Sequence, residues 1–98
     1  MAKIRLSRKA IADLDSIWDY TVETWSEEQA VIYYRQIYTT IQGLNSLPVF
    51  LEKGYDVIKP GLSGYKIGHH IVFYKKYQDG SICADRILHE KMDYQRHL

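Results

Sequence analysis

Residues 7–44, SRKAIADLDSIWDYTVETWSEEQAVIYYRQIYTTIQGL, determine most of the architecture that the sequence predicts. Apolar residues recur here every three or four positions, which is typical of one face of an α-helix. Ser7 and Ser26 stand at N-cap positions, and SEEQ at 26–29 is a capping box with two acids in the first helical turn. The pattern predicts helices over roughly 8–24 and 27–46, and their short joint requires an antiparallel hairpin.

The apolar stripes of these helices predict the residues that face the core. The predicted core positions are Ala10, Leu14, Trp18, Thr21 and Trp25, then Ala30, Tyr34, Ile37, Ile41 and Leu44, with Ile11, Ile17, Val22 and Tyr33 beside them. Trp18 and Ile37 are expected on facing stripes. Val31, Ile32 and Tyr38 project away from the stripe of the second helix, so a surface that another chain covers is one interpretation.

Strand patterns flank the hairpin on both sides. KIRLS at 3–7 predicts a short first strand, and 48–64 predicts a connecting loop with one helical turn near 49–52. Two further strands are expected on either side of Gly68–His69, and Asp79-Gly80 predicts a tight turn into a last strand, SICADRILH. We expect one α+β domain over residues 1–98, ordered β-α-α-β-β-β, with an antiparallel sheet, the hairpin on one face and a short C-terminal helix.

Composition limits the classes of function. The net charge of +1 argues against a nucleic-acid binder held by bulk electrostatics, so no direct sequence-specific nucleic-acid contact is expected. The single cysteine excludes a disulfide framework, and no apolar run is long enough for a signal peptide or a membrane span. These features predict a cytoplasmic protein.

The motifs of metal, phosphate and nucleophile chemistry are missing. His69 and His70 are adjacent, so on a strand they point to opposite faces, and Cys83, His89 and His97 match no common zinc spacing. PGLSG at 60–64 lacks the rest of a P-loop. Cys83 is interpreted as a small core residue. We therefore expect no metal and no cofactor.

Acid–base cleavage of RNA remains an alternative. By residue type, this chemistry would use Arg86 as an anion clamp, His89 as a general acid and Tyr94 as a positioning group. Strand alternation places Arg86 with Ala84 and Leu88 on one face and His89 on the other, so they converge only if the strand ends by Leu88.

The first helix carries a row of like charges. Asp15, Asp19 and Glu23 follow one another at four-residue steps, a spacing at which each pair repels by roughly 0.2–0.5 kcal/mol. Residues 11–30 contain six acids and no base, whereas residues 1–10 contain four bases and no acid. The row is either a solvated face or a face that awaits a basic partner.

Three stretches resemble one known family. LSRKAIADLDSIWDYTVETWSEEQA at 6–30, KPGLSGYKIGHHIVFYK at 59–75 and RILHEKMDYQRHL at 86–98 are similar to the ParE branch of the ParE/RelE toxin superfamily. The resemblance implies a type II toxin in a hetero-oligomer with a ParD-like antitoxin, and a non-enzymatic action on DNA gyrase. RelE-type relatives instead cleave mRNA on the ribosome, so that activity stays open, as does a degenerate toxin that serves only as an interaction module.

The resemblance, together with the patterns above, predicts two contact surfaces and no catalytic residue. The expected target-binding residues, at the C-terminal end, are Arg86, His89, Lys91, Met92, Tyr94 and Arg96. The expected antitoxin-binding residues are Asp15, Asp19, Glu23, Ile32 and Tyr38.

Overall fold

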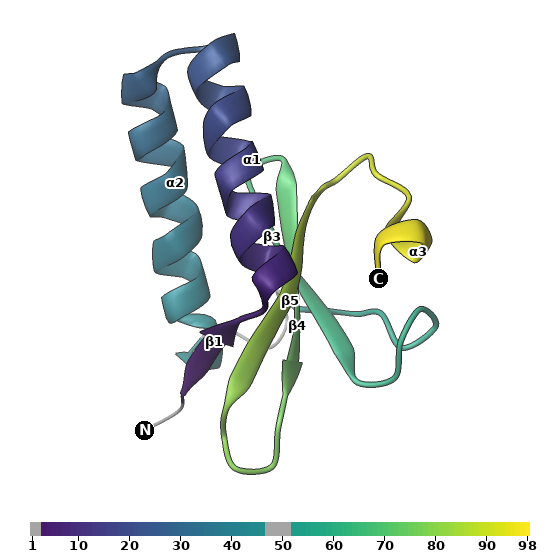
Figure 1. Ribbon diagram of the computed structural model, residues 1–98. Coiled ribbons are helices and arrows are strands. Elements are labelled where there is room, and N and C mark those ends of the chain that lie inside the picture. The colour runs from purple at the N-terminus through teal and green to yellow at the C-terminus, as the bar shows by residue number, and fades with distance from the viewer. Residues whose placement is uncertain (1–2, 47–51) are drawn as a thin grey trace.

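A helical hairpin lies against one face of a twisted sheet in the computed structural model, which describes residues 3–46 and 52–98 (Figure 1). Helix α1 spans Arg8–Thr24 and helix α2 spans Glu27–Gln42. The hydroxyl oxygens of Ser7 and Ser26 each accept a hydrogen bond of 3.0 Å from the backbone N–H three residues later, which confirms both predicted caps. Helix α2 ends at Gln42, earlier than expected, with Gly43 as its C-cap, and the 3-10 turn η1 follows at Leu44–Ser46. Residues 49–51 of the predicted extra turn lie outside the described part of the chain.

The sheet contains five strands in the order β1-β5-β4-β3-β2. Their bounds are Ile4–Leu6 (β1), Lys53–Gly54 (β2), Leu62–Ile67 (β3), His70–Lys76 (β4) and Ile82–His89 (β5). The predicted α+β class is confirmed, but the sheet is mixed and not antiparallel throughout, because β1 pairs with β5 in parallel. The direction of a strand depends on the connection that leads to it, which alternation within the strand does not encode. Strand β2 was predicted as loop, since two residues are too few to show a pattern.

Strand β5 contains an irregularity that changes which side chains share a face. Phe73 pairs with Arg86 and the next residue, Tyr74, pairs with Ala84, so Asp85 is an extra residue in a β-bulge. Ala84 and Ile87 consequently both face the hairpin. The prediction that Arg86 shares a face with Ala84 is therefore wrong.

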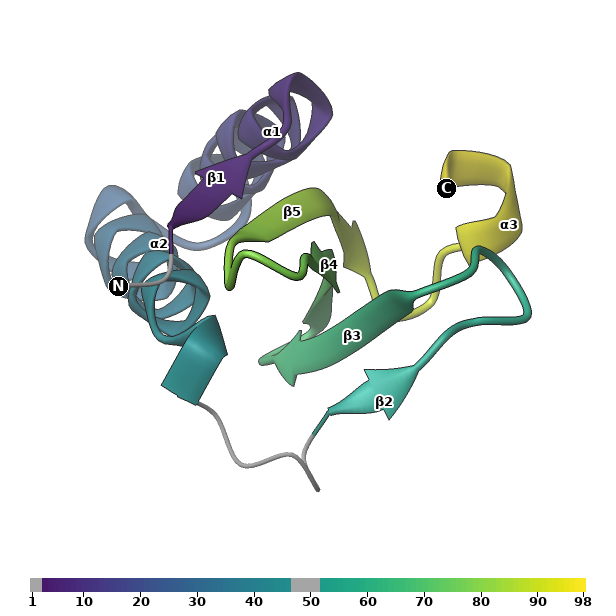
Figure 2. The ribbon, with the colours of Figure 1, turned by 90° about the horizontal axis from the view of Figure 1, so that it is seen from below.

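Apolar clusters cover both faces of the sheet. The larger one, between sheet and hairpin, is built on Leu14, Ile17, Ile37, Ile41, Leu44, Ile67, Val72, Tyr74, Ile82, Ala84 and Ile87. On the opposite face Leu62, Ile71, Phe73 and Leu88 are covered by Tyr55, Tyr94 and Leu98. Figure 2 shows the hairpin on one side of the sheet and the C-terminal helix α3, Tyr94–His97, on the other. The predicted short terminal helix is thus present.

The predicted helical stripes were partly wrong. Trp18 is half-buried at the hairpin flank, where its ring meets Tyr34 edge-on at 5.9 Å, while Trp25 is 74% exposed and Tyr34 37% exposed. Ile17 and Tyr33 pack inward instead. In a straight helix, side chains seven residues apart differ by about 20° in their direction around the axis. A stripe extended through Trp18 and Trp25 therefore turns away from the buried face.

Of two further expectations about burial, one is confirmed and one is wrong. Val31, Ile32 and Tyr38 are exposed, as predicted. Cys83 is only half-buried, so it is not the core residue that was expected, and its burial still raises the pKa of the thiol. No helix in residues 3–46 or 52–98 combines the length and the hydropathy needed to cross a membrane.

Candidate functional site: a groove lined by histidines

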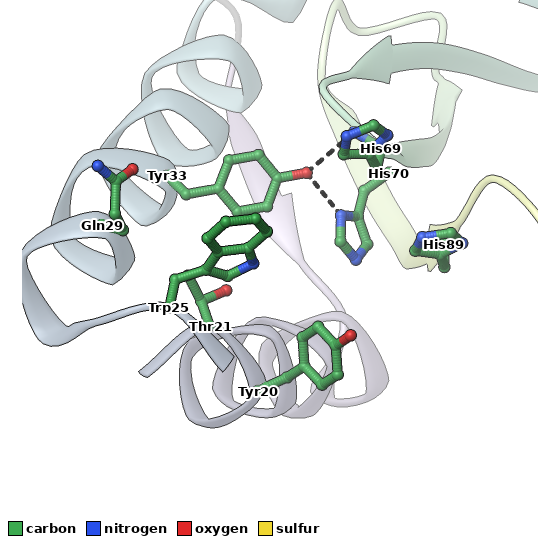
Figure 3. Close-up of a pocket in the computed structure, with 8 residues that line it drawn as sticks. All are labelled: Tyr20, Thr21, Trp25, Gln29, Tyr33, His69, His70 and His89. Atoms are coloured by element: carbon green, nitrogen blue, oxygen red, sulfur yellow. Dashed lines mark hydrogen bonds between the residues drawn. The ribbon is translucent and has the colours of Figure 1, made fainter. Parts of the chain in front are cut away.

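A groove runs between the hairpin and the ends of β4 and β5. It consists of two adjoining hollows of about 400 and 510 Å³, which share Tyr20, His70 and His89. The first hollow is lined by Tyr20, Thr21, Trp25, Gln29, Tyr33, His69, His70 and His89 (Figure 3). The second is lined by Asp13, Ser16, Ile17, Tyr20, His70, Arg86, Ile87, Leu88, His89, Met92 and His97. All four histidines of the chain therefore lie on this surface, which we call the histidine groove.

Tyr33 of α2 organises the first hollow. Its hydroxyl oxygen lies 2.6 Å from Nδ1 of His70 and 3.2 Å from the carbonyl oxygen of Ile67, and the backbone N–H of His69 donates to it at 3.2 Å (Figure 3). Gly68 permits this approach, because a Cβ there would lie 2.7 Å from the Tyr33 ring, and its φ of 57° is a left-handed conformation that favours glycine. The tight β3–β4 turn thus orients His70.

His70 is held neutral. Burial lowers the pKa of its imidazole to about 4, with further lowering from His89 and His69. The ring of His89 stands edge-on to His70 at 5.3 Å, and that of His69 stacks beside His89 at 6.4 Å. Burial also raises the pKa of Tyr33, so its phenol stays protonated. At neutral pH the inner wall of the groove carries no charge from these two residues.

The outer rim carries an acid between two basic groups. Glu90 accepts from Nδ1 of His69 at 3.0 Å and lies 3.5 Å from Nζ of Lys66. The hydrogen bond with His69 lowers the pKa of the Glu90 carboxyl below its ordinary value, and the charge of Lys66 lowers it further. Lys91 donates its backbone N–H to Nδ1 of His89 at 3.2 Å, which fixes the turn that follows β5.

Arg86 is engaged inside the protein. Its guanidinium donates to both carboxylate oxygens of Asp13, at 2.8 and 2.9 Å, and to the carbonyl oxygen of His97 at 2.9 Å. The Asp13 carboxylate also accepts a hydrogen bond of 2.9 Å from the backbone N–H of Ile87. Strand β1 ends before this point, since its last pair with β5 is Leu6–Ala84. The carboxylate therefore satisfies an N–H of β5 that has no β1 residue beside it. The hydrogen bond to Asp13 raises the pKa of Arg86. Asp13 was not predicted, because only the fold brings it to a residue 73 positions away.

The predicted target-binding residues separate into three groups. Arg86, His89 and Met92 line the histidine groove. Tyr94 lies on the opposite face, where its ring packs on Phe73 at 5.0 Å and its hydroxyl donates to the carbonyl oxygen of Glu90. Lys91 and Arg96 are exposed. Arg86 and His89 thus share one surface, while Tyr94 does not reach it.

The predicted antitoxin-binding residues are all exposed but do not form one patch. Asp15, Asp19 and Glu23 lie along α1. Tyr38 stacks on Tyr34 at 6.4 Å, on the flank of α2 that contacts Trp18. Ile32 lines a shallow hollow with Arg35 and Gln36, about 120° away from Tyr38 around the helix at 100° per residue.

The groove is lined mainly by aromatic, imidazole and apolar side chains. Within the described ranges no group of three or more histidine, cysteine, aspartate or glutamate residues is arranged to hold a metal ion. Asp13 and Arg86 neutralise each other. Exposed aromatic rings and the neutral imidazole of His70 suit the burial of another molecule's apolar groups.

Comparisons with known proteins agree on one family. The sequence model described as "ParE toxin of type II toxin-antitoxin system, parDE" matches residues 4–94. Toxin ParE1 of Mycobacterium tuberculosis is 36% identical over 93 residues, which cover 95% of this chain and 94% of that protein. Toxin ParE1 of Caulobacter vibrioides is 36% identical over 98 residues, with 100% and 99% covered. A solved structure titled "Chromosomal ParDE TA system from P. aeruginosa" superposes with a TM-score of 0.75 at 23% identity, covering 91% of this chain and 96% of that one, and shows the shared fold.

Proposed function

The chain belongs to the family of ParE toxins, the toxin components of type II toxin–antitoxin systems, and from this premise we propose that it poisons DNA gyrase by binding. A ParD-like antitoxin neutralises it in a hetero-oligomeric complex in the cytoplasm. Neither role needs a cofactor or a catalytic residue. The proposal concerns the target and the contact surfaces, since the family leaves both open.

The positions of three residues favour a function in binding over one in catalysis. Arg86, His89 and Tyr94 are the acid–base candidates for RNA cleavage. The Arg86 guanidinium is bonded to Asp13 and to the carbonyl oxygen of His97, and Tyr94 packs on the far side of the sheet. A general acid and an anion clamp must reach the same phosphate. Since one candidate is bonded within the protein and another lies on the opposite face, the structure favours a toxin that acts by contact.

The exposed end of the chain is the proposed target surface. Lys91, Met92 and Arg96 project from the turn after β5 and from α3, and Arg96 pairs only loosely with Asp93, at 3.6 Å. Arg86 binds this segment through the carbonyl oxygen of His97, and Tyr94 anchors it by packing on the ring of Phe73. We assign exposed cations and Met92 to gyrase contact, and Arg86 and Tyr94 to holding the segment in place.

The acidic side of α1 is the proposed antitoxin surface. Asp15, Asp19 and Glu23 are exposed and without an ion pair among the described residues. A basic amphipathic segment would relieve their mutual repulsion and cover the exposed apolar side chains nearby. Tyr38 lies on the adjoining flank of α2, and Ile32 extends the contact only if the antitoxin also wraps around that helix.

The test is controlled expression of the toxin in growing bacteria, with and without its antitoxin. Gyrase poisoning predicts growth arrest accompanied by DNA damage, which co-expressed antitoxin prevents. Rapid decay of ribosome-bound mRNA without early DNA damage would instead support the RelE-like alternative. Normal growth with retained antitoxin binding would identify a degenerate toxin.

A further inference from the structure

We propose that the histidine groove receives a large apolar side chain from a basic segment of the antitoxin, and that acidification weakens this contact. The inference rests on the proposed neutralisation by an antitoxin. It adds a point of entry, the chemistry of the entering segment and a dependence on pH.

The groove joins the two surfaces assigned above. At one wall Tyr20 projects from α1 three residues before Glu23 of the acidic row, and residues three apart are neighbours on a helix surface. At the other wall lies Met92, from the proposed gyrase-binding segment. A segment that crosses the acids and enters the groove therefore covers Met92 as well, which explains neutralisation as direct occlusion of the target surface.

The walls suit an apolar side chain. Tyr20 is 65% exposed and Trp25 74% exposed. The exposure of two large aromatic rings to water in one hollow is unusual for a free monomer. Tyrosine and tryptophan are the residue types that most often dominate binding energy at protein interfaces. Among the described residues that line the groove, Asp13 and Arg86 carry a charge at neutral pH, and they are bonded to each other. A charged group entering this groove would find no free partner there, whereas an aromatic or long aliphatic group would replace water at Tyr20 and Trp25.

Charge complementarity selects a basic segment around that anchor. Asp15, Asp19 and Glu23 repel one another along α1, and lysine or arginine residues flanking the anchor would lie against them. A segment of this kind, with an apolar anchor and basic flanks, is the occupant that both features require together. A second copy of the toxin is the competing occupant that the experiment must exclude.

The imidazoles on the groove walls other than that of His70 make the contact sensitive to acid. Imidazoles in general gain a proton as the pH falls through about 6.5. His69 faces Glu90 and Lys66, His89 faces the other two rings and the Lys91 backbone, and His70 faces Tyr33. His97 lies at the same end of the groove as Arg86, and its carbonyl oxygen accepts a hydrogen bond from Arg86. Asp13 also lines this end of the groove. Of the anionic neighbours, Asp13 and Glu90 already have cationic partners, and Asp85 lines a further hollow with His97 that also contains Arg8, Lys9, Lys59 and Lys75.

An apolar anchor would remove water from imidazoles that become charged. The bound toxin then takes up fewer protons than the free toxin, so affinity falls as the pH falls. One histidine whose pKa drops by one unit on binding weakens the complex by up to about tenfold. With His70 held neutral and His69 partly balanced by Glu90, we expect the Kd to rise about 10- to 100-fold between pH 7.5 and 5.5.

The experiment measures the Kd of purified toxin and the antitoxin that protects cells against it, at pH 7.5 and 5.5. Tyr20→Ala and Trp25→Ala should each weaken binding at least tenfold at pH 7.5. Tyr77→Ala, an equally drastic change at an exposed tyrosine in the β4–β5 turn, is the matched control and should leave the Kd unchanged. The triple variant His69→Asn, His89→Gln, His97→Gln should bind with much less change between the two pH values, whatever histidines the antitoxin itself contains.

Three results would overturn the inference. The first is tight binding by Tyr20→Ala and Trp25→Ala, and the second is an unchanged pH profile in the triple histidine variant. The third is concentration-dependent self-association of the free toxin that Tyr20→Ala abolishes, which would assign the groove to a second copy. In each case charge reversal on α1 could still weaken the complex and leave the proposed antitoxin surface standing. A wild-type toxin that binds no antitoxin at all would refute the proposed neutralisation itself. Circular dichroism melts of each variant ensure that only folded proteins are compared.

Discussion

Asp13 on α1 and Arg86 on β5 form a two-pronged ion pair, with nitrogen–oxygen distances of 2.8 and 2.9 Å between residues 73 positions apart. Both side chains are largely buried, and the same carboxylate completes the backbone bonding of β5 at Ile87. The same guanidinium holds the carbonyl oxygen of His97. The pair thus fastens hairpin, sheet and C-terminal segment at one point.

Removing Asp13 should destabilise the protein strongly. Asp13→Ala leaves the largely buried guanidinium without its anionic partner and the Ile87 N–H without its acceptor, and breaking such a pair costs about 3 kcal/mol. Arg86→Lys should also lower stability, because an ammonium cannot make the two parallel bonds to the carboxylate. Urea unfolding measures both, and the exposed Arg96→Ala serves as a control with an unchanged midpoint. Equal midpoints for Asp13→Ala and wild type would show that the pair is not structural.

Ile37 should matter more to the core than Trp18. Ile37 is 0% exposed in the middle of the larger cluster, so Ile37→Ala should cost about 3 kcal/mol. Trp18 is half-buried and contacts Tyr34 at the hairpin flank, so Trp18→Ala should cost less, about 2 kcal/mol. Denaturant unfolding ranks the two variants. The reverse order would mean that α1 presents a different face to the sheet.

These positions show what the sequence could predict and what it could not. The hairpin was predictable because each helix carries its own cap and its own apolar period, and both are local signals. The boundary between buried and flanking residues was not, since Trp18 and Trp25 continue a seven-residue pattern that rotates off the core face. The parallel direction of β1 depends on the path of the chain, and the bulge at Asp85 interrupts an alternation that otherwise looks regular.

The site was predictable only in part. The exposed acids on α1 and the exposed Lys91 and Arg96 follow from charge and position in the sequence. The histidine groove does not, because the β3–β4 turn, β4, β5 and the C-terminal segment supply its imidazoles and only folding brings them together. Arg86 was assigned to the target, whereas its partner Asp13 belongs to a helix near the other end of the chain.

Stability should depend on pH through His70. Its pKa in the folded protein is about 4, below the ordinary value of about 6.5. Between these pH values the unfolded chain binds a proton that the folded protein does not, so the free energy of unfolding decreases as the pH falls from about 6.5 to about 4. His70→Gln should show a smaller loss of melting temperature between pH 7 and 5 than wild type. Parallel pH profiles for the two proteins would show that His70 titrates normally.

Charge on α1 should govern the rate of antitoxin association. The triple reversal of Asp15, Asp19 and Glu23 to lysine should slow association and weaken its dependence on salt, because electrostatic steering acts mainly on the on-rate. Replacement of the same residues by Asn, Asn and Gln should give an intermediate rate. Stopped-flow or surface-binding kinetics across a salt series measures this. Identical rates for all three proteins would remove α1 from the interface.

The most direct test of gyrase poisoning by contact is a supercoiling assay with purified gyrase, toxin and antitoxin. Wild-type toxin should inhibit supercoiling, antitoxin should restore it, and the folded double variant Lys91→Glu, Arg96→Glu should inhibit at least about tenfold less well, as expected for charges at a binding surface. His89→Gln should retain inhibition. Full gyrase activity in the presence of folded wild-type toxin, together with cleavage of ribosome-bound mRNA that His89→Gln abolishes, would contradict the account.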